Sequence, residues 1–203
     1  MTDGYPPNPA PELVARGADL EELAKAADAC RSCHLYQDAT QAVFGEGPGS
    51  TTYLMVGEQP GDQEDRRGKP FVGPAGRVLD DALHEAGIDR DATYVTNVVK
   101  HFKWKPGPDS KPRLHAKPNR TEITACRPWL DAEIERVDPA VIVCLGATAA
   151  QSVIGPSVRV TRDHGVPFEF DGRLAVATIH PSAVLRARGD RETRFAQLVA
   201  DLE

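Results

Sequence analysis

The sequence predicts an α/β fold, a three-layer α/β/α sandwich with a central, mainly parallel four-stranded sheet. Four short apolar runs have the length of buried strands and are bounded by glycine or polar residues. Segments with apolar residues at helical spacing separate these runs, and strands that alternate with helices form parallel sheets with helices on both faces. The four strands are expected at residues 53–56, 93–99, 140–145 and 174–179.

The helices are predicted from residues that favour helix ends. Asp19 suits the N-cap of a helix that runs to about Cys30. Pro74 suits the first turn of a helix that stops at Gly87. Gly146 opens a short helix after the third strand. Two more helices are expected at residues 128–137 and 190–202, and a pair of edge strands is expected at 158–170.

The length and composition fit one domain with a hydrophobic core, since 40% of the 203 residues are hydrophobic. Residues 1–17 are proline-rich, so we expect a flexible N-terminal arm without a regular helix, followed by a single domain over residues 18–203. No apolar run approaches the roughly 18 residues of a membrane span, and no export signal precedes the domain. We therefore expect a soluble, cytoplasmic monomer that has no contact with a membrane.

The net charge of −6 conceals a basic segment between Lys100 and Arg120. This segment carries seven lysine and arginine residues against the single Asp109, and its four prolines indicate a stiffened loop outside any sheet interior. A basic patch in an acidic chain is typical of a site for a polyanion. The alternative, a solvated lysine-rich loop, remains open.

The four cysteines favour a metal centre over disulfides, because we expect a protein that stays in a reducing compartment. Cys30 and Cys33 form a C-x-x-C half-site, whereas Cys126 and Cys144 are separated by 17 residues, so a zinc ribbon fits poorly. Four thiolates in this pattern suit a [4Fe-4S] cluster. The alternative is that Cys126 and Cys144 are simply small buried hydrophobic residues.

Polar side chains follow three of the predicted strands at their carboxyl ends. Glu58, Gln59 and Asp62 follow the first strand. Asn97 lies near the end of the second strand, and His180 follows the fourth. In open α/β sheets, ligands bind in the crevice beyond these strand ends. The sequence therefore predicts a binding or catalytic site at this edge of the sheet.

A set of motifs runs through the chain from Cys30 onward. It comprises the C-x-x-C pair, the stretches 57–61 and 68–76, Asn97, the later cysteine pair and the stretch 180–182. In order and spacing, this set resembles family 4 of the uracil-DNA glycosylases. The resemblance implies the uracil-DNA glycosylase fold and the removal of uracil from single- or double-stranded DNA, with the nucleotide flipped into a pocket.

Gln59 and the long basic segment narrow the resemblance to the UdgX branch. Turnover members of family 4 usually have alanine at the position of Gln59, whereas the UdgX branch captures uracil-containing DNA covalently through a loop histidine that matches His115. In that branch the segment reads Lys-Arg-Arg-Ile-His, so Pro112 and Leu114 depart from its pattern. Pro112 removes a cation and a backbone donor next to Lys111. A turnover glycosylase and a noncatalytic uracil-DNA binding module remain the alternatives.

The resemblance assigns roles in recognising and releasing the base. Asn97 would pair with uracil and reject cytosine, and the ring of Phe71 would stack on the base. Gln59 is placed in the same uracil pocket. His180 would donate a hydrogen bond to the negative charge that develops on the leaving uracil.

The resemblance also implies a nucleophile, because the sugar cation left by uracil must be captured. His115 would attack C1′ and form a stable bond, and Glu58, assisted by Asp62, would orient the imidazole or accept its proton.

The DNA contacts are expected on two sides of the pocket. Lys111 and Arg113 would bind phosphate on one side. On the other, Leu185 would wedge into the vacated stack and Arg186 would grip the strand, unless these residues simply begin an arginine-rich helix.

Overall fold

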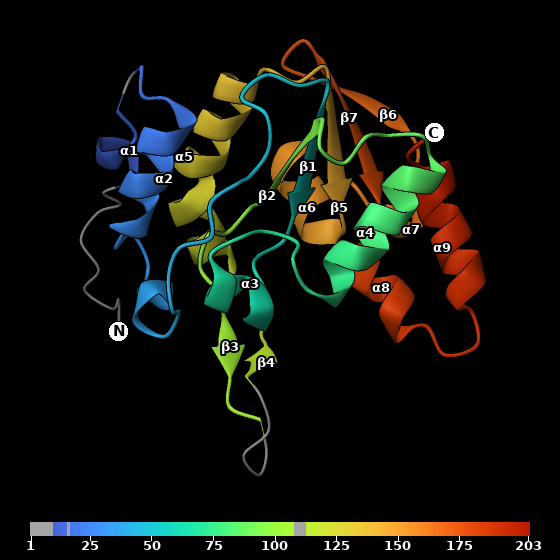
Figure 1. The fold of residues 1–203 in the computed structure, drawn as a ribbon, viewed down its shortest axis with the longest axis horizontal. Coiled ribbons are helices and arrows are strands. Elements are labelled where there is room, and N and C mark those ends of the chain that lie inside the picture. Colours follow the sequence, from blue (N-terminus) through green and yellow to red (C-terminus); the bar gives the residue numbers. More distant parts are fainter. Residues whose placement is uncertain (1–9, 16, 108–112) are drawn as a thin grey trace.

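The computed structural model describes residues 10–15, 17–107 and 113–203. Its main sheet has five strands in the order β2-β1-β5-β7-β6, of which the first four are parallel and β6 pairs antiparallel with β7 (Figure 1). The strands are β1 (Tyr53–Gly57), β2 (Thr93–Asn97), β5 (Val141–Leu145), β6 (Pro167–Phe170) and β7 (Arg173–Thr178).

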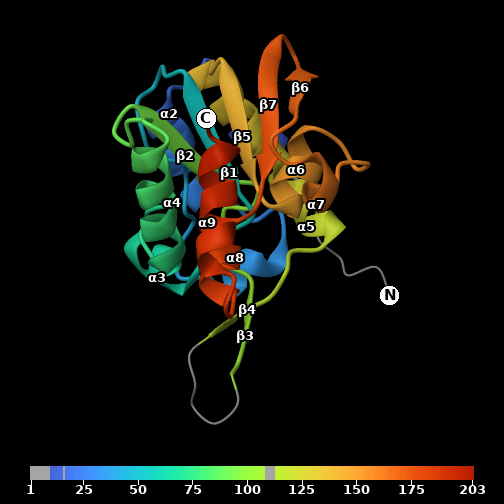
Figure 2. The same ribbon diagram turned by 90° about the vertical axis from the view of Figure 1, so that its right-hand side faces the viewer.

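Helices connect the strands and cover both faces of the sheet. The helices are α1 (Ala10–Leu13), α2 (Leu20–Asp28), α3 (Asp62–Arg67), α4 (Pro74–Glu85), α5 (Arg120–Val137), α6 (Ala147–Val153), α7 (Val160–Asp163), α8 (Pro181–Arg186) and α9 (Arg191–Ala200), with a 3-10 turn at His34–Gln37. Two short strands, β3 (Trp104–Lys105) and β4 (Leu114–His115), pair as a hairpin that projects beyond the sheet in Figures 1 and 2. We call this element the basic hairpin.

Side chains along each strand point alternately to the two faces of the sheet, and the helices that pack on these faces complete the three layers. Leu54 and Val56 of β1 pack in one core with α2, α5 and α6, whereas Met55 packs in a second core with α4. A third cluster joins α4 to α8 and α9 on the same side as Met55. Successive side chains of a strand point to opposite faces, so a continuous apolar run can serve both layers. The predicted α/β/α architecture is confirmed.

The four predicted core strands are present, and one edge strand extends the sheet to five, where a pair of edge strands was expected. Residues 160–163 form α7 and only residues 167–170 form an edge strand. Arg159 donates its backbone N–H to the Asp163 carboxylate (2.8 Å), a local contact that supports the helical turn. The antiparallel edge is therefore a single strand next to β7.

Helix α5 begins eight residues before the predicted start at Pro128. Asn119 is its N-cap, and its side chain accepts from the backbone N–H of Glu122 (2.9 Å) while Glu122 accepts from the Asn119 N–H (2.7 Å). This capping box satisfies two backbone donors at the helix start. Pro128, where the helix was expected to begin, lies inside it.

The N-terminal expectation is corrected in part. Residues 10–13 form the short helix α1, which lies against α5, although residues 1–17 were expected to hold no regular helix. Residues 1–9 and 16 of the predicted arm lie outside the described residues. Among the helices of the described residues, none is long and apolar enough to cross a membrane.

The strand order places a crevice beside β1. Strand β2, which follows β1 in the chain, pairs with one edge of β1. The next strand of this sheet, β5, pairs with the opposite edge of β1. Loops that follow β1 and β5 therefore diverge, and in α/β sheets ligands bind at such a switch point.

Candidate active site

A cavity of about 790 Å³ opens at the carboxyl edge of the sheet, where the sequence predicted a site. Loops after four parallel strands and the basic hairpin contribute to its wall. The predicted residues on the wall are Glu58, Gln59, Asp62, Phe71, Asn97, His115, His180, Leu185 and Arg186.

Asn97 and Phe71 form a close-packed part of the wall that depends on Gly57. Asn97 ends β2 directly opposite Gly57 and is buried. A Cβ atom on Gly57 would lie 2.4 Å from Asn97 Oδ1 and 2.7 Å from the Phe71 ring, so only glycine allows both side chains to approach. Phe71 adopts a left-handed backbone with φ of 54°, a conformation that often marks functional sites.

His180 is held in one tautomer. It is the N-cap of α8, and its Nδ1 accepts from the backbone N–H of Ser182 (3.1 Å), so the neutral ring carries its hydrogen on Nε2. Burial lowers the pKa of His180 to about 4, and the positive charge of Arg186 adds to this effect. The ring also stacks with Phe71, with centroids 6.2 Å apart and planes 25° apart. At neutral pH, His180 is a neutral N–H donor.

His115 and Glu58 are brought together from segments 57 residues apart. His115 lies on β4 with its side chain half exposed, and its Nε2 is 3.6 Å from Glu58 Oε1. The hydroxyl of Thr148 donates to Glu58 Oε2. Burial lowers the pKa of His115, Glu58 acts in the opposite direction, and Arg186 adds to the lowering. The neutral imidazole, which has a lone pair, is therefore favoured.

Asp62 contacts arginines in place of the expected His115. Its carboxylate accepts from Arg66 Nε (2.9 Å) and from Arg113 Nε (2.6 Å). Burial opposes the charge of Asp62, but the hydrogen bonds from both arginines outweigh burial and lower its pKa. Among the contacts of the described residues, Asp62 has none to His115, so its observed role is to anchor the basic hairpin.

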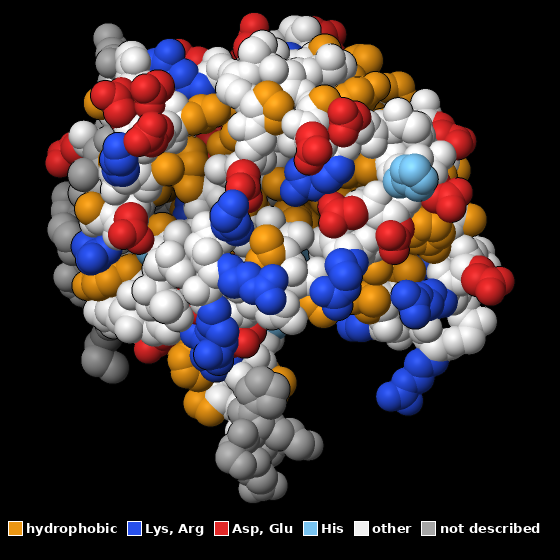
Figure 3. All heavy atoms as spheres, viewed as in Figure 1, with side chains coloured by type: hydrophobic (Ala, Val, Ile, Leu, Met, Phe, Trp, Pro, Cys, Tyr) orange, Lys and Arg blue, Asp and Glu red, His pale blue; other side chains and the backbone are white. Residues whose placement is uncertain are grey.

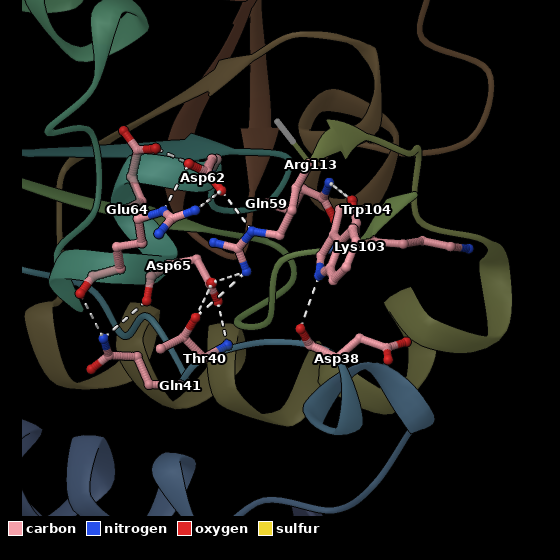
Figure 4. A network of polar contacts seen from close by, with 12 residues as sticks. Asp38, Thr40, Gln41, Gln59, Asp62, Glu64, Asp65, Lys103, Trp104 and Arg113 are labelled. Atoms are coloured by element: carbon pink, nitrogen blue, oxygen red, sulfur yellow. Dashed lines mark hydrogen bonds and ion pairs between the residues drawn. The ribbon is translucent and has the colours of Figure 1, made fainter. Parts of the chain in front are cut away.

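Arg113 is partly buried in that anchor, although the sequence analysis expected it to bind DNA phosphate. Besides Asp62, it donates to Asp65 Oδ2 (2.7 Å), and its guanidinium lies over the rings of Phe102 and Trp104 (Figure 4). Asp65 has no exposed surface and also accepts from Thr40. Two carboxylates saturate the charge of Arg113, which leaves little for a phosphate.

Gln59 closes the base of the basic hairpin, although its side chain was predicted to bind uracil. Its amide donates to the carbonyls of Lys103 and Ala116, both at 3.1 Å, and accepts from the Lys103 N–H at 3.0 Å. These backbone groups flank the two short strands, so one side chain ties both to the end of β1. An alanine at this position would leave all three contacts unmade.

The remaining residues that were predicted to contact DNA are described only in part. Lys111 lies outside the described residues. Leu185 and Arg186 are exposed on the cavity wall, as expected for groups that meet DNA. Lys117 also lines the cavity and was not singled out from the sequence. Figure 3 shows Lys and Arg side chains gathered over α3, α4 and α8 on one face.

Three of the four cysteines meet at a second, small cavity. Cys30, Cys33 and Cys126 line it together with His101, whereas Cys144 lies in β5, away from it. Only burial acts on the pKa of Cys144, which it raises, while Cys30 and Cys33 both act on Cys126. The predicted set of four cysteines is therefore not brought together. His101 takes the fourth position on the cavity wall.

The second cavity carries three thiols and one imidazole, a set of donor groups that iron–sulfur clusters use. Among the described residues, no three His, Cys, Asp or Glu side chains are arranged to hold one metal ion. In a cluster each ligand binds a different iron, so the ligands stand farther apart. Trp129 Nε1 donates to Cys30 Sγ (3.4 Å) and the Lys100 N–H donates to Cys126 Sγ (3.2 Å), contacts that stabilise thiolates.

Thr148 and Ser182 are functional residues that the sequence analysis missed. Ser182 belongs to the stretch that was recognised, but its role in orienting His180 depends on the backbone. Thr148 follows the third predicted strand, where no site residue was sought. The rule applied to the other strands, that polar residues just after a carboxyl end meet in one crevice, also points to Thr148.

Comparisons with known proteins agree with the site. Residues 44–203 match the family model described as the uracil DNA glycosylase superfamily. The type-4 uracil-DNA glycosylase of Thermotoga maritima is 37% identical over 193 residues, which cover 94% of this chain and 95% of that protein. Those of Pyrobaculum aerophilum and Sulfurisphaera tokodaii are 36% and 34% identical, covering 83% and 82% of this chain and 85% and 76% of their own.

The chain belongs to the uracil-DNA glycosylase superfamily. Within that superfamily its relatives are type-4 uracil-DNA glycosylases, which confirms the resemblance to family 4.

Proposed function

We propose that this chain is a uracil-DNA glycosylase of family 4 that excises uracil from DNA and then captures the abasic sugar covalently through His115. The observation that supports excision is that one cavity is lined by the amide of Asn97, the ring of Phe71 and a neutral N–H donor at His180. The observation that supports capture is the pairing of a half-exposed His115 with Glu58 on the same wall.

Asn97 reads the base. Its amide can accept from N3–H of uracil and donate to O4, whereas the amino group of cytosine would meet the Asn97 donor. Phe71 lies beside Asn97 and offers its ring to the face of the base. Because Asn97 is buried, a base that leaves its amide unpaired loses a hydrogen bond that water cannot replace.

His180 stabilises the leaving group. As the C1′–N1 bond breaks, its electron pair leaves with uracil, and the Nε2–H of His180 donates to the developing negative charge on the base. A preorganised neutral donor in a water-poor pocket is effective because it needs no rearrangement during the reaction. Solvent then protonates the released uracil anion.

His115 captures the sugar cation. The reacting form is the neutral imidazole, whose Nε2 lone pair forms the bond to C1′, and a protonated His115 must first give its Nε2 proton to Glu58. The ring regains its neutral charge by releasing the Nδ1 proton to solvent. Water would perform the same attack in a turnover enzyme, so capture depends on how closely His115 approaches C1′ relative to water.

The proposed function is tested with a uracil-containing oligonucleotide in single- and double-stranded form. Uracil release is followed by base chromatography and the adduct by its slow migration on a denaturing gel. We expect stoichiometric uracil release and an adduct with the wild-type chain, and release without adduct for His115→Ala. Repeated release without an adduct would support a turnover glycosylase, and tight binding without release a noncatalytic module.

We also propose that the second cavity holds a [4Fe-4S] cluster. Cys30, Cys33 and Cys126 would bind three of its irons, and His101 would take the place that the sequence gave to Cys144. Such a cluster supplies redox chemistry or a structural link between α2 and α5. Iron and acid-labile sulfide in the purified protein should fall in His101→Ala and stay unchanged in Cys144→Ala, and the opposite result would restore Cys144 as ligand.

A further inference from the structure

Thr148 is a buried hydroxyl on the cavity wall that neither the recognition of uracil nor its release uses. It lies in the first turn of α6, is only 5% exposed, and donates to Glu58 Oε2. We propose that Thr148 is a positioning residue for the covalent capture step, because it holds one oxygen of Glu58 and thereby turns the other toward His115. This inference rests on the proposed capture by His115.

The position of Thr148 is determined by the sheet and not by the loop that carries Glu58. Helix α6 follows β5 directly, and Ala149 and Ala150 bury that helix in the core. Gly146 turns the chain at φ of 94°, and a Cβ atom there would lie 3.0 Å from His180 Cβ. The start of α6 therefore packs against one functional histidine and holds the carboxylate partner of the other.

Glu58 needs this support because it has few other partners. Among the described residues, its carboxylate has one hydrogen bond, from Thr148, and one ion-pair contact, to His115. A carboxylate turns freely about its last bonds unless a donor fixes one oxygen. With Oε2 occupied by Thr148, Oε1 is the acceptor that faces His115 Nε2, 3.6 Å away.

The role of Thr148 in the chemistry is geometric. In the capture step Glu58 Oε1 faces Nε2 and takes its proton when His115 is protonated, and the Nε2 lone pair of the neutral ring forms the bond to C1′. Thr148 neither gains nor loses a proton in this step. If Glu58 turns away, His115 is aimed less well and water attacks the sugar cation instead, so uracil is still released but less of the protein ends as adduct.

The test compares Thr148→Val, which keeps the shape but removes the hydroxyl, with Thr148→Ser, which keeps the hydroxyl. Ser152→Ala is the matched control, because Ser152 donates to the Thr148 backbone carbonyl on the same helix and does not contact Glu58. Single-turnover reactions on a uracil-containing oligonucleotide give two numbers for each variant, the rate of uracil release and the fraction of released uracil that ends as adduct. Thermal melting of each variant reports folding.

We expect Thr148→Val to lower the ratio of adduct to hydrolysed sugar about tenfold, the size of one lost hydrogen bond to a charged group, while the rate of uracil release changes less than about twofold. Thr148→Ser and Ser152→Ala should behave as the wild-type chain. An unchanged adduct fraction in Thr148→Val would overturn the inference, and so would equal losses of release and adduct together with a lower melting temperature. A wild-type chain that releases uracil but forms no adduct would instead contradict the proposed capture itself.

Discussion

The two walls of the cavity are built in different ways. The wall that faces the base consists of Asn97 and Phe71, which are buried and packed around Gly57, and of His180, the partly buried N-cap of α8. The wall that carries His115 is a hairpin of two-residue strands that extends beyond the sheet, and polar contacts hold it in place. Base recognition is therefore part of the core, whereas the nucleophile is carried by an appendage.

This difference suggests how one fold can either release the abasic DNA or keep it as a covalent adduct. Excision needs only the wall formed by Asn97, Phe71 and His180, which we call the core wall. Changes in the basic hairpin should therefore leave the rate of excision unchanged. Capture needs the hairpin to place an imidazole within bonding distance of C1′, and Arg113 and Gln59 are the side chains that hold the hairpin to α3 and β1. Changes in each wall should therefore give different kinetic signatures.

The largest effect is expected from Gly57→Ala, which breaks the core wall. The added methyl group would meet Asn97 Oδ1 at 2.4 Å, so both Asn97 and Phe71 must move. A shift of about 1 Å in a reacting geometry costs roughly a hundredfold in rate, and we expect that loss in uracil release. Adduct should disappear in parallel because capture follows excision.

Gly49→Ala is the control for this variant. A Cβ atom on Gly49 meets only Leu20 Cδ1, at an ordinary 3.7 Å. Its uracil release, measured under single-turnover conditions, should equal that of the wild-type chain. A Gly57→Ala protein that is folded and fully active would show that the close approach of Asn97 to Gly57 is not needed.

A smaller effect, confined to capture, is expected from Arg113→Lys. A lysine is a point charge and cannot bridge Asp62 and Asp65 as the forked guanidinium does. We expect adduct formation to slow by about tenfold, with uracil release unchanged, because the hairpin places His115 less well. The rates of uracil release and of adduct formation, measured on the same oligonucleotide, distinguish an effect on the hairpin from an effect on the core wall.

Arg66→Ala is the matched control for the hairpin anchor. Arg66 pairs with the same Asp62, but its side chain is exposed and does not contact the hairpin. Exposed pairs contribute little, about 0–1 kcal/mol, so neither step should change. If Arg113→Lys slowed uracil release as much as adduct formation, the separation between core and hairpin would fail.

The smallest effect concerns pH. Capture needs neutral His115, so its rate falls as pH drops through the pKa of that imidazole. Arg186 lowers this pKa, and Arg186→Gln removes that cause, so the acid limb of the adduct rate should move to higher pH. The same change should raise the pKa of His180.

Arg188→Gln is the control, because the charge of Arg188 is not among the causes that shift the pKa of His115 or His180. Adduct rates between about pH 5 and 8 cover the range in which histidine titrates. A shift of the Arg186→Gln limb to lower pH would contradict the assignment of Arg186 as a repulsive neighbour of His115.

Predictions from local pattern were accurate where the signal was local. The four parallel strands, the N-cap Asp19 of α2 and the Pro74 start of α4 agree with the structure. The start of α5 was missed, because the capping box at Asn119 and Glu122 follows directly on the proline-rich segment that was expected to be a loop. Local signals compete, and only the packed structure shows which one prevails.

Predictions that needed partners were less accurate. Glu64 and Asp65 could not be told from solvated loop residues, yet Glu64 accepts from the backbone N–H groups of Gly61 and Gly73 and Asp65 receives Arg113. Each of these carboxylates follows a glycine turn in an acidic stretch, and nothing in that stretch indicates which cation or N–H group approaches it.

The sequence by itself determined the α/β fold, the edge of the sheet that carries the site, and the residue types that line it. Periodicity and strand-end position suffice for this, because the carboxyl ends of parallel strands always share one edge. The tertiary structure alone decided the partners: Thr148 with Glu58, Arg113 with two aspartates, and His101 among the cysteines. A side chain's partner depends on how segments tens of residues apart are brought together, and that placement results from the packing of the whole core.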